Sequence, residues 1–287
     1  MAEVAAHLVD HVLPVVPIRQ WVLSLPYSLR TMLGYDPELL GVVLRVFMRA
    51  VSGWIRDKVR EKVGLIDGRD VHFGAVTFIQ RFGDALDLNP HFHSLVLDGA
   101  YVVRHGRFEG FVQIGAPSDE DVAGIAVQVA KRVVRMLRRR GKVEDDEVTP
   151  VEDDGSMLLP CMAASVQRVG VVGEGAGRSL QRPGRRRDVE LGRAAKRRCA
   201  DVDGFSLHAD VGVPARDRAQ LERLCRYVAR PAIASERLEL LPDGRVRYRF
   251  KRAWRDGSVA VEFDPIDFVG KLAALVPRPH SNLVRYQ

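Results

Sequence analysis

The stretch from residue 73 to residue 114 carries a succession of β-strand patterns, and it limits most strongly how this chain can fold. β-Branched and aromatic residues gather in four short segments, at 73–82, 91–97, 100–104 and 108–114. Asp98-Gly99 stands between the second and the third segment and is typical of a tight turn. Strands joined by such short turns pair antiparallel, so the sequence predicts an antiparallel sheet.

Helical patterns surround this sheet. Apolar residues recur at intervals of three and four in 2–13, 36–62, 118–140, 217–230 and 265–275. Ser118 is a suitable N-cap for one helix, and Pro231 ends another. Further strands are predicted at 20–25, 238–241, 245–251 and 258–263. The predicted fold class is therefore α+β, an antiparallel β-sheet packed with helices on at least one face.

Length and composition bound the domain organisation. The chain has 287 residues, of which 46% are hydrophobic, enough to bury a core in one large domain or two small ones. We expect an N-terminal helical region with one short strand at 1–65 and a main domain at 66–287. Within the main domain, 141–200 is rich in glycine and charge, and we expect a basic insertion of long loops around short strands.

The charge balance favours a polyanionic partner. The formal net charge is +7, and Lys and Arg concentrate at 131–140 and 178–198. Such runs are also common on ordinary solvated surfaces. Three cysteines without a CxxC pair exclude a disulfide scaffold or a Cys-rich zinc module in this sequence. No segment resembles a membrane span or a secretion signal, so we expect a cytoplasmic protein with no membrane partner.

His91-Phe92-His93 is the first candidate for chemistry. In a strand, residues two apart point to the same face, so both imidazoles stand side by side. Two imidazoles at this spacing can share a divalent metal, although they can equally be structural histidines. Gln80, on the preceding strand, could project beside them as a third ligand or be an ordinary strand amide. Asp98 has the opposite parity and is a poor candidate.

Tyr227 is the second candidate. In the helix predicted at 217–230 it lies beside the apolar stripe, with Arg223 and Arg230 on the same face. A phenol between two guanidinium groups suits phosphate chemistry, because the arginines bind phosphate oxygens and favour phenolate. The alternative is a tyrosine at the edge of a packed helix with solvated arginines. Trp254, between Arg252 and Arg255, is a candidate for stacking on a nucleobase.

Several blocks of the sequence resemble a known family. Gln80-Arg-Phe-Gly83 and Leu88-Asn-Pro-His-Phe-His-Ser-Leu-Val-Leu-Asp-Gly99 look like the metal motif of HUH-type single-strand DNA endonucleases. More narrowly, they resemble the transposase domain of bacterial rolling-circle insertion sequences and insertion-sequence common regions. Gly204–Asp210 (GFSLHAD) and Leu221–Pro231 (LERLCRYVARP) are similar to later blocks of that family.

The resemblance implies a ferredoxin-like or RRM-like palm and a transposase that nicks and rejoins single-stranded DNA at the ends of a mobile element. Tyr227 would form a 5′-phosphotyrosine link, and His91, His93 and Gln80 would hold Mg²⁺ or Mn²⁺. Arg223 and Pro231 stand four residues before and after Tyr227, so a single-tyrosine version is expected. We also expect this chain to lack the zinc-binding segment with which the family usually begins.

With single-stranded DNA as the implied substrate, the basic residues become candidate backbone contacts. These are Lys131, Arg132, Arg135, Arg138, Arg139, Arg185, Arg186 and Arg187, together with Arg223 and Arg230. Two alternatives to the transposase stay open at this point. One is a rolling-circle replication initiator or plasmid relaxase, which shares the histidine pair and the tyrosine. The other is a DNA-binding remnant without catalysis.

Overall fold

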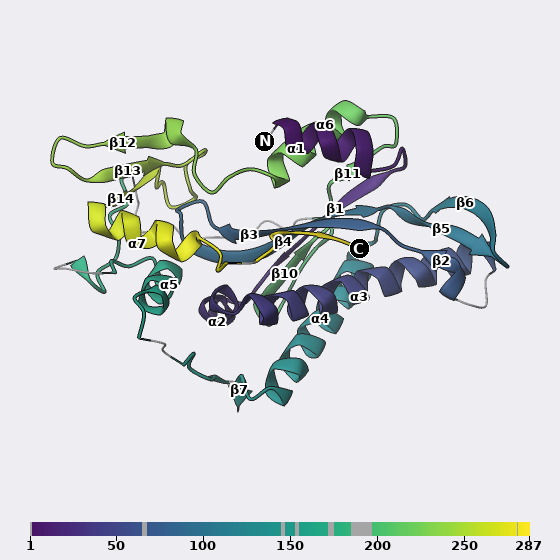
Figure 1. The fold of residues 1–287 in the computed structure, drawn as a ribbon, viewed down its shortest axis with the longest axis horizontal. Coiled ribbons are helices and arrows are strands. Elements are labelled where there is room, and N and C mark those ends of the chain that lie inside the picture. Colours follow the sequence, from purple (N-terminus) through teal and green to yellow (C-terminus); the bar gives the residue numbers. More distant parts are fainter. Residues whose placement is uncertain are drawn as a thin grey trace.

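The structure is a computed structural model that describes residues 2–64, 68–144, 147–152, 155–171, 175–184, 197–279 and 281–287. It confirms the α+β fold class. The described residues form a seven-stranded antiparallel sheet in the order β15-β3-β4-β1-β10-β9, with β11 also paired to β1 (Figure 1). Its strands are β1 (Ile18–Ser24), β3 (Ala75–Phe82), β4 (Leu88–Leu97), β9 (Cys199–Val202), β10 (Phe205–His208), β11 (Gly212–Val213) and β15 (Val284–Tyr286).

Strand β4 lies inside this sheet and is buried on both faces. Leu95 and Leu97 pack into one apolar cluster, while Phe92 and Val96 pack into another on the opposite face. The period-two alternation of a strand produces this division. The predicted segment 91–97 was too short, because β4 already begins at Leu88. Asn89 and Pro90 form a bulge there, where proline costs no ladder hydrogen bond.

Helices cover both faces of the sheet (Figure 1). On one side lie α1 (Ala2–His7), the short π-helix Leu8–Val12 and α6 (Arg218–Val228). On the other side lie α2 (Arg30–Tyr35), α3 (Pro37–Val63) and α4 (Asp119–Arg139), with a 3₁₀ turn at Tyr27–Leu29. Ser118 caps α4 through a capping box with Asp121, as the sequence predicted for Ser118. Within the described residues, no helix is long and apolar enough to cross a membrane.

A third cluster of buried residues joins α5 (Leu158–Gln167), α7 (Pro265–Leu275) and a small sheet. That sheet contains β12 (Leu238–Leu240), β13 (Val246–Arg249) and β14 (Ala260–Phe263). The remaining elements are the sheet β2 (Val71–His72), β5 (Gly99–Arg104) and β6 (Arg107–Gln113), the pair β7 (Val143–Glu144) and β8 (Glu147–Val148), and 3₁₀ turns at Gly68–Asp70 and Ser235–Arg237.

Helix α5 corrects the expectation of long loops around short strands in this region. Its sequence LLPCMAASVQ is apolar almost throughout and has a proline in its first turn, so it shows no amphipathic pattern. It forms a helix because it is packed between α2 and α7, with Cys161 and Met162 buried.

Arg81, in β3 opposite the bulge, links the third cluster to the central sheet. Its buried guanidinium donates to the carbonyl oxygens of Gly34 at 2.7 Å, Leu275 at 3.1 Å and Ala274 at 3.1 Å. These carbonyls belong to the last turns of α2 and α7, where the helix dipole favours a cation. Burial lowers the pKa of Arg81 to about 10, so it stays charged at neutral pH.

The strand of the expected N-terminal region lies in the middle of the central sheet. β1 pairs with β4 along its whole length. Arg19 in β1 forms a buried two-pronged ion pair with Asp98, at 3.0 and 2.8 Å, and also donates to the carbonyl oxygen of Ala209 at 3.1 Å. Asp98 is therefore committed to Arg19, in agreement with the parity argument against it as a metal ligand.

Removing the Asp98 carboxylate should destabilise the fold. Asp98→Asn leaves the Arg19 guanidinium buried without a counter-charge, which costs roughly 3–5 kcal/mol. Urea unfolding of wild type and variant measures the difference. Asp57→Asn is the matched control, because its pair with Arg60 is exposed and contributes about 0.5 kcal/mol or less. Equal losses in the two variants would contradict this role of the Arg19–Asp98 pair.

Candidate active site

The two histidines of β4 face the side of the sheet that α6 covers. His91 and His93 are 8% and 4% exposed, and their Nε2 atoms lie 3.1 Å apart. The rings meet edge to face with centroids 4.9 Å apart. The spacing in the sequence predicted this side-by-side arrangement, and the structure brings the two imidazoles together.

Each Nδ1 atom has its own partner. Nδ1 of His91 donates to the carbonyl oxygen of Asn89 at 2.7 Å, which leaves its Nε2 lone pair free. Nδ1 of His93 lies 2.8 Å from the side-chain amide nitrogen of Gln20, on the neighbouring strand β1. With the amide donating to Nδ1, the His93 proton sits on Nε2 and points to Nε2 of His91. Both rings are thus fixed by partners outside the pair.

Both imidazoles are neutral at physiological pH. Burial lowers the pKa of His91, and the nearby Arg230 and Arg30 lower it further. Burial, followed by the charges of His91 and Arg230, lowers the pKa of His93 to about 3. A neutral imidazole is the form that binds a metal ion.

Gln80 stands directly opposite His91 on β3. Its amide nitrogen donates to the carbonyl oxygen of Val228 in the last turn of α6 at 2.8 Å. Its Oε1 atom is buried and has no hydrogen-bond partner in the described part of the chain, and the same is true of Oδ1 of Asn89. Unpaired buried oxygens are costly, so two of them beside His91 indicate room for a donor or a cation.

Helix α6 brings Tyr227 to the histidine pair. The Tyr227 ring meets the His93 ring edge to face at a centroid distance of 5.8 Å and is 42% exposed. The Arg230 guanidinium lies 4.7 Å from the centre of the Tyr227 ring, and its Nε has no partner among the described residues. Arg218, at the start of α6, donates to the carbonyl oxygens of Val9, Leu13 and Pro14.

An open pocket of about 800 Å³ reaches Asn89, His91, Tyr227 and Arg230. It is lined by Phe82, Gly83, Asp84, Asn89, His91, Tyr227, Arg230, Phe250, Lys251, Arg252, Ala253, Trp254 and Arg255. Four cations line this pocket, namely Arg230, Lys251, Arg252 and Arg255. The one carboxylate in the described lining is that of Asp84. The pocket can therefore accept an anionic chain beside Tyr227.

Other candidate residues lie elsewhere. Arg223 is exposed one turn before Tyr227 and does not line the pocket. Helix α4, on the opposite side of the sheet from α6, carries five exposed basic candidates: Lys131, Arg132, Arg135, Arg138 and Arg139. Arg185, Arg186 and Arg187 lie outside the described residues. The structure thus brings together the histidines, Gln80, Tyr227 and Arg230, but not the α4 cations.

Trp254 lies in the pocket wall, but its ring is already covered. It stacks on Phe250 with centroids 4.4 Å apart, and the guanidinium groups of Arg168 and Arg182 lie over it at 5.0 and 5.7 Å. The expected stacking of Trp254 on a nucleobase would require these groups to move.

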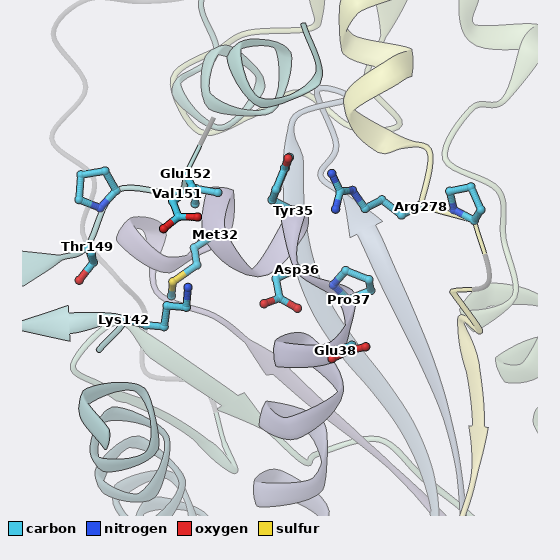
Figure 2. A pocket seen from close by; sticks show the side chains of 12 residues that line it. Met32, Tyr35, Asp36, Pro37, Glu38, Lys142, Thr149, Val151, Glu152 and Arg278 are labelled. Carbon is cyan, nitrogen blue, oxygen red and sulfur yellow. The ribbon is translucent and has the colours of Figure 1, made fainter. Parts of the chain in front are cut away.

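A second pocket, of about 460 Å³, has neither His91 nor His93 in its described lining. Figure 2 shows the side chains that line it. The carboxylates of Asp36, Glu38 and Glu152 and the cations of Lys142 and Arg278 line it. Arg278 lies over the ring of Tyr35 at 4.1 Å. Three carboxylates repel a phosphate chain, so the histidine pocket is the better candidate for binding one.

The sequence reasoning missed Gln20 and Asn89. Asn89 shares its strand parity with His91 and His93, so the alternation alone could have found it. Gln20 contacts His93 only because β1 pairs with β4, and nothing local to residues 20–25 signals that pairing.

Paired imidazoles, a tyrosine and an arginine beside an open cationic pocket of an α+β fold suit phosphate-ester chemistry, the chemistry that a nucleic-acid-processing protein requires. The comparison with protein families agrees: residues 74–287 match the family described as "Putative transposase". The match covers more than half of the chain, and the chain belongs to this transposase family. No significant match was found among curated proteins or among solved structures.

Acidification should destabilise the metal-free protein. The unfolded His93 binds a proton below about pH 6.5, whereas the folded ring does so only near pH 3, so stability falls as the pH drops through this window. Between pH 7 and pH 5, His93 alone accounts for a loss of about 2 kcal/mol. Urea unfolding in EDTA at pH 7 and pH 5 measures this loss of stability. His93→Gln should show a correspondingly weaker pH dependence, and an unchanged one would contradict the neutral buried ring.

Proposed function

We propose that this transposase-family protein nicks single-stranded DNA and transfers the strand through a covalent link to Tyr227, in the manner of HUH-type rolling-circle transposases. The observation that carries the proposal is the edge-to-face contact of Tyr227 with His93, whose Nε2 lies 3.1 Å from that of His91, beside a cationic pocket that Tyr227 and His91 line. The resemblance of the His91 and Tyr227 blocks to that family supports it.

The residues present fit a divalent cation. The two Nε2 atoms are 3.1 Å apart, close enough to bind one ion together. Oε1 of Gln80, buried and unpaired among the described residues, supplies a third donor. No third His, Cys, Asp or Glu joins the pair in the described ranges. His91, His93 and Gln80 would thus hold Mg²⁺ or Mn²⁺, and such an ion would supply Lewis-acid polarisation of the scissile phosphate.

For both Nε2 atoms to face a cation, His93 must give up its Nε2 proton and carry it on Nδ1. Nδ1 then becomes a donor, and Gln20 satisfies it by presenting its amide oxygen instead of its nitrogen. Gln20 can do this because a side-chain amide carries both a donor and an acceptor. It is therefore a positioning residue for His93 in either state.

The chemical step is a transesterification. The Tyr227 oxygen forms a bond to the scissile phosphorus, and the bond from phosphorus to the 3′ oxygen of the preceding nucleotide breaks. The phenol proton leaves, the released 3′ oxygen takes up a proton, and the 5′ phosphate stays on Tyr227. Arg230, 4.7 Å from the centre of the Tyr227 ring, stabilises the negative charge on the phosphate. Rejoining reverses these changes, so no nucleotide cofactor is required.

Substituting the nucleophile should abolish the covalent product. With Tyr227→Phe and Mn²⁺, labelled oligonucleotides from the ends of the host element should give no protein–DNA band on a denaturing gel. Binding to single strands should stay nearly unchanged, because only a hydroxyl is lost. Tyr286→Phe is the matched control: Tyr286 is exposed in β15 and should leave the band intact. A band that persists in Tyr227→Phe would move the nucleophile elsewhere.

Two sets of variants test the donor set. His91→Ala with His93→Ala should reduce cleavage to its metal-free level. Gln80→Glu should still bind Mn²⁺, since a carboxylate is a good ligand, but an ionised carboxylate cannot donate to Val228 and should slow adduct formation. Mn²⁺ affinity by electron paramagnetic resonance and adduct rates by gel separate these effects. If Gln80→Ala binds Mn²⁺ with the wild-type affinity, Gln80 is not a metal ligand.

A further inference from the structure

The connection between β13 and β14 forms the wall of the pocket that faces Tyr227. Six consecutive residues of it, Phe250 to Arg255, line the pocket together with His91, Tyr227 and Arg230. β12 and β13 lie on the same side of the central sheet as α1 and α6 (Figure 1). Segments far apart in the sequence thus build the two walls.

This wall presents cations to the pocket. Lys251, Arg252 and Arg255 are exposed, and Arg230 faces them from the other wall. In the described part of the chain, no carboxylate forms an ion pair with Lys251 or Arg252. Lys251 and Arg252, unpaired in that part of the chain, attract a polyanion without discriminating between bases.

The wall is also held in place. Phe250 and Trp254 stack nearly parallel at 12°, and the backbone ladder continues through Phe250 to Val259 and Trp254 to Ser258, each at 2.8 Å. Arg182 pairs with Asp256 at 3.4 Å, and Arg168 lies over Trp254. Trp254 therefore acts as the core of this connection, and the neighbouring cations are presented from an ordered backbone.

We infer that residues 251–255 bind the phosphate backbone of single-stranded DNA next to the scissile phosphate. This inference rests on the proposed function, since it assumes that the strand reaches Tyr227. A strand attacked by Tyr227 must continue along the pocket on at least one side, and Lys251 and Arg252 line that path. Single-stranded DNA fits because the pocket is open and cationic and the rings of Phe250 and Trp254 already stack on each other, which favours backbone contacts over base readout by this wall.

The salt dependence of binding tests this inference. A fluorescein-labelled oligothymidine of ten nucleotides is titrated with the protein between 50 and 200 mM NaCl, in EDTA and in the Tyr227→Phe background so that no covalent capture occurs. Each phosphate contact to a single strand contributes about 0.7 to the slope of log Kd against log salt. Lys251→Gln with Arg252→Gln should weaken binding and lower the slope by about 1.4.

Arg135→Gln with Arg139→Gln is the matched control, because it removes the same charge from the opposite side of the sheet. It should leave the slope for this short oligonucleotide unchanged. An unchanged slope in the Lys251 and Arg252 variant, or an equal fall in both variants, would overturn the inference. Circular dichroism confirms that each variant is folded.

Adduct formation separates this inference from the proposed function. With Tyr227 intact, the Lys251 and Arg252 variant should need more DNA than wild type to reach half of its maximal adduct, and a DNA dependence equal to that of wild type would contradict the binding role. If the wild-type protein forms no adduct with any oligonucleotide, the proposed function fails. A slope difference between the two charge variants would still support DNA binding at residues 251–255.

Discussion

The confinement of β4 is the constraint on which the candidate site depends. β3 and β1 pair with its two edges, and apolar clusters cover its two faces. The strand can neither slip in register nor turn over, because a shift of one residue would exchange Phe92 for the histidines. His91 and His93 are therefore held on one face, where burial and the nearby Arg230 keep them neutral. The chemistry of the pair follows from the packing of the strand.

The site is assembled from segments that are distant in the sequence and extends beyond the matched family region at 74–287. β1 supplies Gln20, which orients His93. The N-terminal helical segment provides the carbonyl groups that hold Arg218, and thereby the first turn of the helix that carries Tyr227. Gln80 contacts the other end of that helix through Val228. The position of Tyr227 thus depends on contacts at both ends of α6.

Sequence reasoning was reliable wherever a local pattern had one structural meaning. The capped, amphipathic α4 and the strand parity of His91 and His93 follow from spacing alone. Helix α5 was missed because tertiary packing, rather than an apolar stripe, makes it helical. Gln20 could not be found, since strand order between β1 and β4 is a long-range property. The basic run of α4 was visible in the sequence, but its location on the side of the sheet opposite α6 was not.

That location affects how a nucleic acid can lie on the molecule. The cations of α4 and those around Tyr227 are on opposite layers, with the central sheet between them. A strand that touched both would have to travel around an edge of the sheet, leaving the nucleotides in between unprotected. If both surfaces bind the same strand, its footprint consists of two protected segments separated by a nuclease-sensitive gap, and the gap length reports the path around the sheet.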